Sequence, residues 1–131
     1  MWLLDTNVWI TYLNKKSFQV QSHILSVSIE KVLLCDVVKA ELYYGAYKSA
    51  KQTENLARLE KLFSITHSLP FDAKAARCFG EIRTILERKG TPIGAYDMQI
   101  AAIALANHLT LVTHNTKEFS RIPNLILEDW E

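Results

Sequence analysis

Three acidic residues of this 131-residue chain lie where a carboxylate needs an explanation. Asp5 directly follows the apolar run Trp2–Leu4 and precedes polar residues that can start a helix. Glu41 lies among apolar neighbours, and Asp97 is the only charged residue within 95–107. An ionised carboxylate in apolar surroundings is costly unless it is paired or binds a metal. Several carboxylates without a basic partner are typical of an oxygen-ligand site for Mg²⁺ or Mn²⁺.

Each acid also has an ordinary structural explanation. Asp5 can cap the helix that follows it, because Asp is a common N-cap residue. Glu41 can be a surface residue that pairs with Lys39 or Lys48. The helix dipole favours Asp97 near a helix start, although a position one turn inside the helix makes this a partial account. The convergence of all three acids favours the metal site.

A metal in such a site would suit a phosphate ester. Mg²⁺ takes only one or two protein carboxylates and keeps several waters, so positions remain open for phosphate oxygens. It activates a water for attack and stabilises the charge that builds on phosphorus. With the three acids set aside, 11 of the 14 acidic residues remain, against 15 Lys and Arg residues. The rest of the chain is then mildly basic, which is compatible with a polyanionic substrate held by metal.

Short apolar runs alternate with helical patterns, which predicts a three-layer α/β/α sandwich with a mostly parallel sheet in a single domain, residues 1–131. The predicted strands are 2–4, 32–35, 64–69, 110–113 and 125–127. The predicted helices are 8–13, 20–29, 37–48, 53–63, 72–90 and 95–108, with a short helix or turn at 114–120. Asp36 and Asp72 are predicted N-caps, and Gly90 a helix end. Asp5 then lies at the carboxyl edge of the sheet, where ligands bind.

Other classes of protein are disfavoured. No apolar stretch is long enough to cross a bilayer, and no basic region precedes an apolar core, so a cytoplasmic protein is expected. Cys35 and Cys78 form no close pair and the four histidines are scattered, which argues against a zinc site or a disulfide scaffold. The four glycines never cluster into a phosphate-binding loop.

Five stretches together resemble a known family. They are Leu4–Asn7, Ala40–Ala46, Pro92–Asp97 running into Ile100–Ala102, Thr110–Phe119 and Leu127–Trp130. In order and spacing they resemble the PIN-domain ribonucleases, specifically the VapC-type toxins of bacterial toxin–antitoxin pairs, over essentially the whole chain. The resemblance implies a metal-dependent endoribonuclease toxin that cleaves RNA phosphodiesters with a metal-activated water. Mg²⁺ is the implied cofactor, with Mn²⁺ as the alternative.

The resemblance also implies roles for single residues. Asp5 and Asp97 look like the main metal ligands. Glu41 looks like the third acid, which orients metal-bound water or joins a second metal. Thr6 matches the small hydroxyl residue that follows the first acid and holds the site.

The fourth position of the site stays open between two residues. Many family members have an acid where this chain has Asn115. Others have Asn there and an acid three residues later, here Glu118. Either Asn115 supports a water and Glu118 supplies the fourth charge, or three carboxylates suffice. A contribution from Glu118 is favoured.

The implied partners are RNA, a cognate VapB-like antitoxin whose segment occupies a groove, and a second copy in a homodimer. DNA would be reached only through the antitoxin, and no membrane is involved. One alternative is an inactive or regulatory PIN-like domain, which would have lost acids that are present here. Another is a metal-dependent phosphatase. Its dehalogenase type needs a second Asp two residues after the first, where Asn7 stands.

Basic and aromatic residues near the acids have two explanations each. Lys39, Lys117 and Arg121 flank the acids, either as phosphate contacts or as solvated charges. The tyrosines near the acids either stack on bases or belong to the core or a dimer interface. They are Tyr43, Tyr44 and Tyr96.

Overall fold

The computed structural model describes residues 1–131, and at its centre lies a five-stranded sheet in the order β3-β2-β1-β4-β5. Every strand pair is parallel. The strands are β1 (Trp2–Leu4), β2 (Val32–Cys35), β3 (Ser68–Leu69), β4 (Thr110–Val112) and β5 (Leu127–Glu128). The helices are α1 (Thr6–Leu13), α2 (Phe18–Ser26), the 3-10 turn η1 (Ile29–Lys31), α3 (Asp36–Lys48), α4 (Gln52–Ile65), α5 (Ala73–Arg88), α6 (Ala95–Ala106) and α7 (Thr116–Phe119).

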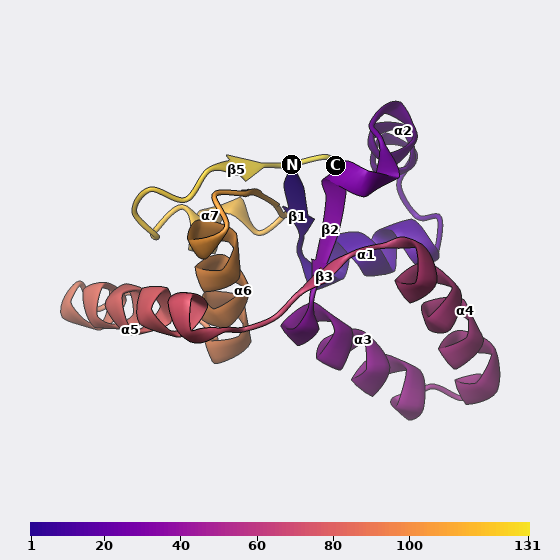
Figure 1. The fold of residues 1–131 in the computed structure, drawn as a ribbon, viewed down its shortest axis with the longest axis horizontal. Coiled ribbons are helices and arrows are strands. Elements are labelled where there is room, and N and C mark those ends of the chain that lie inside the picture. The colour runs from indigo at the N-terminus through magenta and orange to yellow at the C-terminus, as the bar shows by residue number, and fades with distance from the viewer.

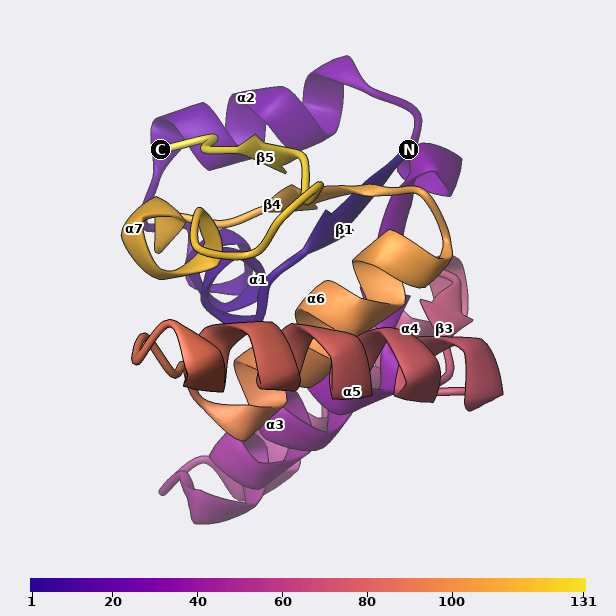
Figure 2. The ribbon, with the colours of Figure 1, turned by 90° about the vertical axis from the view of Figure 1, so that its left-hand side faces the viewer.

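Helices cover both faces of this sheet, as the three-layer prediction requires. Figure 1 shows α5 and α6 on one side of the strands, and α1, α2 and α4 on the other. In Figure 2 α5 crosses in front of α6, against which it packs. β1, β2 and β4 consist mainly of large apolar residues, and Leu3, Leu4 and Leu34 are fully buried. A sheet that is buried on both faces explains why these strands show no alternation of polar and apolar residues.

Two local signals from the sequence are confirmed at the ends of α5. The side chain of Asp72 accepts a hydrogen bond from the Ala75 backbone N–H at 2.9 Å, which satisfies one free donor of the first turn. Gly90 has φ of +68°, a left-handed conformation that glycine adopts without strain. The long amphipathic helix between them therefore begins and ends close to where the sequence predicts.

The prediction for 64–69 is wrong in most of its length. Helix α4 continues to Ile65, and only Ser68–Leu69 pair with β2. Residues 64–65 continue the helical pattern of α4, and they also fit the pattern of a strand. The expected N-cap role of Asp36 is wrong as well. Its side chain instead accepts a hydrogen bond from the Ser68 hydroxyl at 2.6 Å and so connects α3 to β3.

Two further boundaries differ from the prediction. The helix expected over 20–29 ends at Ser26, because Val27 adopts an extended conformation before the separate turn η1. The last strand is Leu127–Glu128, whereas 125–127 was expected. No helix has the length and apolar character needed to span a membrane.

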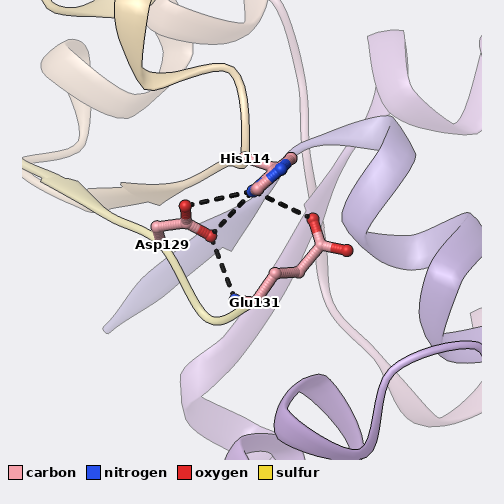
Figure 3. A group of neighbouring side chains, drawn as sticks. All are labelled: His114, Asp129 and Glu131. Carbon is pink, nitrogen blue, oxygen red and sulfur yellow. Dashed lines mark hydrogen bonds and ion pairs between the residues drawn. The ribbon is translucent and has the colours of Figure 1, made fainter.

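The C-terminal segment is anchored to the opposite end of the chain. Trp130 is buried, stacks on His23 of α2 at a centroid distance of 5.0 Å and meets Trp2 edge-on. The residues on either side of it, Asp129 and Glu131, lie 3.1 and 3.4 Å from Nδ1 of His114 (Figure 3). The fold thus gathers an exposed histidine and two exposed acids that follow it in the sequence by 15 and 17 positions.

Candidate active site

Asp5 occupies the carboxyl edge of the sheet, directly after the central strand β1. β1 and β4 are paired in register, Leu4 with Val112, so Asp5 and Thr113 emerge side by side. One carboxylate oxygen of Asp5 accepts the Thr6 backbone N–H at 2.8 Å, and the other accepts the Thr113 hydroxyl at 2.9 Å. Only 6% of Asp5 is exposed. Its carboxylate is therefore held in one orientation, and capping α1 is only part of what it does.

Thr6 connects the first acid to the second. Its hydroxyl donates a hydrogen bond of 2.7 Å to Oε1 of Glu41, across the contact between α1 and α3. No salt bridge joins Glu41 to Lys39 or Lys48. The surface-pair explanation for Glu41 therefore does not hold in this structure.

Asp97 lies in the first turn of α6 and is half-buried. Burial raises the pKa of its carboxyl to about 6, because the charged form loses hydration. The acids whose negative charge adds to this rise are Asp5, Glu41 and Glu118. Burial also raises the pKa of Asp5, against the effect of its hydrogen bonds from Thr113 and Thr6. Four carboxylates thus share one electrostatic environment.

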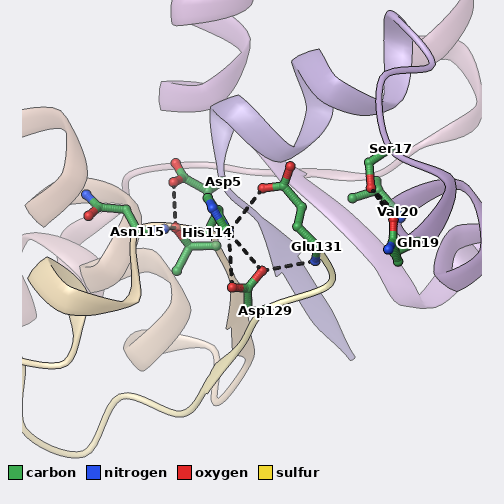
Figure 4. Close-up of polar contacts among 9 residues, drawn as sticks. Asp5, Ser17, Gln19, Val20, His114, Asn115, Asp129 and Glu131 are labelled. Atoms are coloured by element: carbon green, nitrogen blue, oxygen red, sulfur yellow. Dashed lines mark hydrogen bonds and ion pairs between the residues drawn. The ribbon is translucent and has the colours of Figure 1, made fainter.

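Asn115 and Glu118 form a pair in the structure. The side-chain amide of Asn115 donates to Oε2 of Glu118 at 2.8 Å, and its backbone N–H donates to the Thr113 hydroxyl at 3.0 Å. Figure 4 shows Asp5 next to the segment that carries His114 and Asn115. One hydroxyl therefore contacts both the first acid and the residue that holds the fourth.

Thr113 is the site residue that reasoning from the sequence missed. It is fully buried, and its backbone N–H donates to the Glu128 carbonyl at 3.0 Å. A signal was available, because Thr113 is a hydroxyl residue at the end of a buried strand predicted to be parallel to the strand before Asp5. The sequence does not show which strands are neighbours, so it could not identify Asp5 as the partner of Thr113.

A comparison with known families decides where this arrangement belongs. The family model of the PIN domain matches residues 2–125. The chain belongs to the PIN domain family. This confirms the family predicted from the five sequence stretches.

Relatives that match this PIN domain over nearly their whole length are named ribonuclease or endonuclease. The Ribonuclease VapC2 of Rickettsia felis is 41% identical over 132 residues, which cover 100% of this chain and 98% of the relative. The tRNA(fMet)-specific endonuclease VapC of Salmonella typhimurium is 38% identical, covering 98% and 96%. The crystal structure of VapBC2 from Rickettsia felis, bound to a promoter DNA fragment, contains a chain that superposes with a TM-score of 0.92 at 40% identity, covering 99% and 98%. These matches confirm a PIN-like fold of the VapC type.

The acid set of this PIN domain fits a hard divalent cation. None of the four carboxylates forms a salt bridge, so their charge is not neutralised by the chain. All the donors on offer are oxygens, the ligands that Mg²⁺ and Mn²⁺ take. Their oxygen atoms do not close to within 4.8 Å of one another in groups of three, unlike the His114 cluster. That spread agrees with mutual repulsion among like charges.

A groove leads away from the acids along α1, α3 and α4. The groove has a volume of about 200 Å³, and Glu41 is one of its lining residues. Its apolar lining comes from all three helices and includes Ile10, Leu42 and Leu59. Arg58 also lines it, and the guanidinium of this residue donates a hydrogen bond to the Leu13 carbonyl at the end of α1. The groove therefore combines an apolar floor with one fixed positive charge.

Proposed function

We propose that this PIN domain is an endoribonuclease toxin that uses Mg²⁺ or Mn²⁺ to hydrolyse RNA phosphodiesters and is inhibited by a small cognate antitoxin. One observation carries the proposal: the buried Asp5 and three further carboxylates share one site, and no salt bridge of the chain neutralises them. The full-length relatives named ribonuclease and tRNA(fMet)-specific endonuclease support RNA as the substrate.

The residues that would hold the metal are Asp5, Asp97 and Glu41. When bound, the ion supplies Lewis-acid chemistry: it makes water a better nucleophile and offsets negative charge on the phosphate. The chain itself contributes orientation. Two hydrogen bonds fix both oxygens of Asp5, and the Thr6 hydroxyl fixes one oxygen of Glu41. Side chains held in this way need no rearrangement when charge develops in the transition state.

The fourth acid is assigned to Glu118, with Asn115 as its positioning residue. The amide of Asn115 donates to Glu118 and leaves the other carboxylate oxygen of Glu118 without a side-chain donor. The charge of Glu118 reaches Asp97, so the acid belongs to the same site. This supports the version in which both residues contribute.

The proposed inhibitor is an antitoxin segment in the groove beside Glu41. Solved relatives include complexes of VapB with VapC, some of them bound to DNA. An apolar segment in this groove would lie against Glu41 and would obstruct the approach of RNA to the acids. Contact with DNA would then come only through the antitoxin, and the expected assembly is a homodimer.

Cleavage assays with purified protein test the proposal. Structured RNA should be cut in the presence of Mg²⁺ or Mn²⁺, with 5′-phosphate and 3′-hydroxyl ends, and EDTA should stop the reaction. A small antitoxin encoded by an adjacent reading frame should protect the RNA from cleavage when it is added to the assay. Cleavage that persists in EDTA, or products with 2′,3′-cyclic phosphates, would contradict the metal-dependent hydrolysis.

A further inference from the structure

Two exposed tyrosines lie beside the acids, each on an element that carries one of them. Tyr44 follows Glu41 by three residues on α3, and Tyr96 directly precedes Asp97 on α6. Their exposed fractions are 67% and 62%. Residues three apart on a helix lie on the same side, so the Tyr44 ring lies one turn along from Glu41.

Neither ring packs against another aromatic side chain of the protein. Tyr43, by contrast, donates a hydrogen bond of 2.8 Å to Glu60 and packs edge-on against Phe63, which assigns it to the contact between α3 and α4. Tyr44 and Tyr96 take part in no aromatic pair and donate no hydrogen bond. The core explanation therefore applies to Tyr43 alone.

The two rings lie on neighbouring helices. Helices α3 and α6 are in contact, and Figure 2 shows the start of α6 beside α3. Glu41 and Asp97, the acids next to the two rings, belong to one site. An RNA whose phosphodiester reaches these acids brings its neighbouring nucleotides over the flanking surface. Each tyrosine is thus placed to meet a base next to the scissile bond.

We propose that Tyr44 and Tyr96 are stacking platforms for the bases that flank the scissile phosphodiester. The inference rests on the proposed ribonuclease function and adds two substrate-contacting side chains to the acids. Bases inside a helix already stack on each other, whereas unpaired bases are free to stack on aromatic side chains.

A cation near one ring favours RNA over a second copy of the chain as the occupant. Nζ of Lys48 lies 5.6 Å from the centre of the Tyr44 ring. A base stacked on this ring would place its phosphate within the field of that ammonium group. The acids beside the rings must also stay open to substrate, so a partner that covers this face would block the reaction.

Paired substitutions separate stacking from simple apolar contact. Tyr44→Leu and Tyr96→Leu keep apolar bulk and remove the flat ring, whereas Tyr44→Phe and Tyr96→Phe keep the ring. Phe18→Leu is the matched control, because Phe18 is an exposed aromatic ring on α2, a helix that carries none of the acids. The probe is a single-stranded RNA with 2-aminopurine next to the mapped cleavage position, bound in EDTA so that it stays intact.

The expected result is stacking-dependent binding. Wild type and both Phe variants should quench 2-aminopurine fluorescence, and each Leu variant should lose the quenching and raise Kd about tenfold. With Mg²⁺, KM should rise by a similar factor while kcat changes little. An RNA with an abasic site at that position should bind the Leu variants and wild type equally. Phe18→Leu should match wild type throughout.

Two results would overturn the inference: Leu variants that quench and bind like wild type, or Leu variants that lose dimerisation in light scattering. The last result would assign this face to a second copy of the chain. Failure of the proposed function looks different, because wild type itself would then cleave no RNA. The binding measurement in EDTA decides the stacking question in that case too.

Discussion

Two groups of ionisable side chains in this PIN domain differ in their burial and in the charges they contain. The first is the site group, which consists of Asp5, Glu41, Asp97 and Glu118. It is buried or half-buried and contains no positive charge, and burial raises the pKa of two of its members. The second is the tail group, which consists of His114, Asp129 and Glu131. The His114 side chain is 68% exposed and lies within ion-pair distance of both tail acids.

The difference shows that close spacing is a poor guide to function here. The tail group has ligand atoms within 4.8 Å of one another, yet all three of its residues are exposed to solvent. Exposed pairs of this kind contribute about 0–1 kcal/mol. The site group keeps an unneutralised charge in a region of low hydration, which is costly in the metal-free protein. The chain tolerates that cost where the charge has a chemical use.

The largest expected effect is on cleavage. Asp5→Asn keeps the shape of the side chain and removes a metal ligand, so activity should fall on the order of 100-fold or more. Asp129→Asn is the matched change in the tail group and should leave activity within about twofold. Initial rates with RNA and Mg²⁺ measure both. Equal rates for the two variants would erase the distinction between the groups.

A smaller loss is expected at the fourth position. Glu118→Gln should reduce cleavage on the order of tenfold because one charge of the site is removed. Asn115→Ala should also weaken cleavage, since Glu118 loses its donor. Glu131→Gln serves as the control. If Glu118→Gln keeps the wild-type rate and metal affinity, the site works with three carboxylates and Asn115.

Stability should change in the opposite sense from activity. Asp97→Asn removes one of several repelling charges, so in EDTA the variant should be as stable as wild type or more stable, by about 1 kcal/mol. Mg²⁺ or Mn²⁺ should raise the Tm of wild type by mass action, and this rise should shrink in the variant. Thermal melts with and without metal test both points. A variant that melts well below wild type in EDTA would make Asp97 a structural residue.

The smallest effect is the pH dependence of that stability difference. The folded-state pKa of Asp97 is about 6 and its ordinary value is 3.8, so the folded state binds this proton more tightly. Wild type therefore loses stability as pH rises from about 4 to about 6. The advantage of Asp97→Asn in EDTA should be present at pH 7 and vanish near pH 4. Denaturant titrations across this range measure it, with Asp129→Asn expected to show no such trend. An advantage that is constant with pH would contradict charge repulsion as its cause.

Many of the helices and strands that position the site were predictable from the sequence, because the signals for them are local. The apolar run before Asp5 and the cap at Asp72 depend on residues a few positions away, and the structure has both. Glycine at position 90 reports a backbone conformation that its own φ confirms. The motifs around the three acids were enough to predict the family.

Only the tertiary structure decided which side chains meet. The Asp5–Thr113 hydrogen bond spans 108 positions and exists because β1 and β4 are neighbours in register. Tyr43 and Tyr44 have equal local signals, yet one packs against α4 and the other faces solvent. Asp36 had the sequence of a helix cap and instead accepts a hydrogen bond from β3. Local sequence sets the conformation of a segment, whereas strand order and helix orientation determine the partners of its side chains.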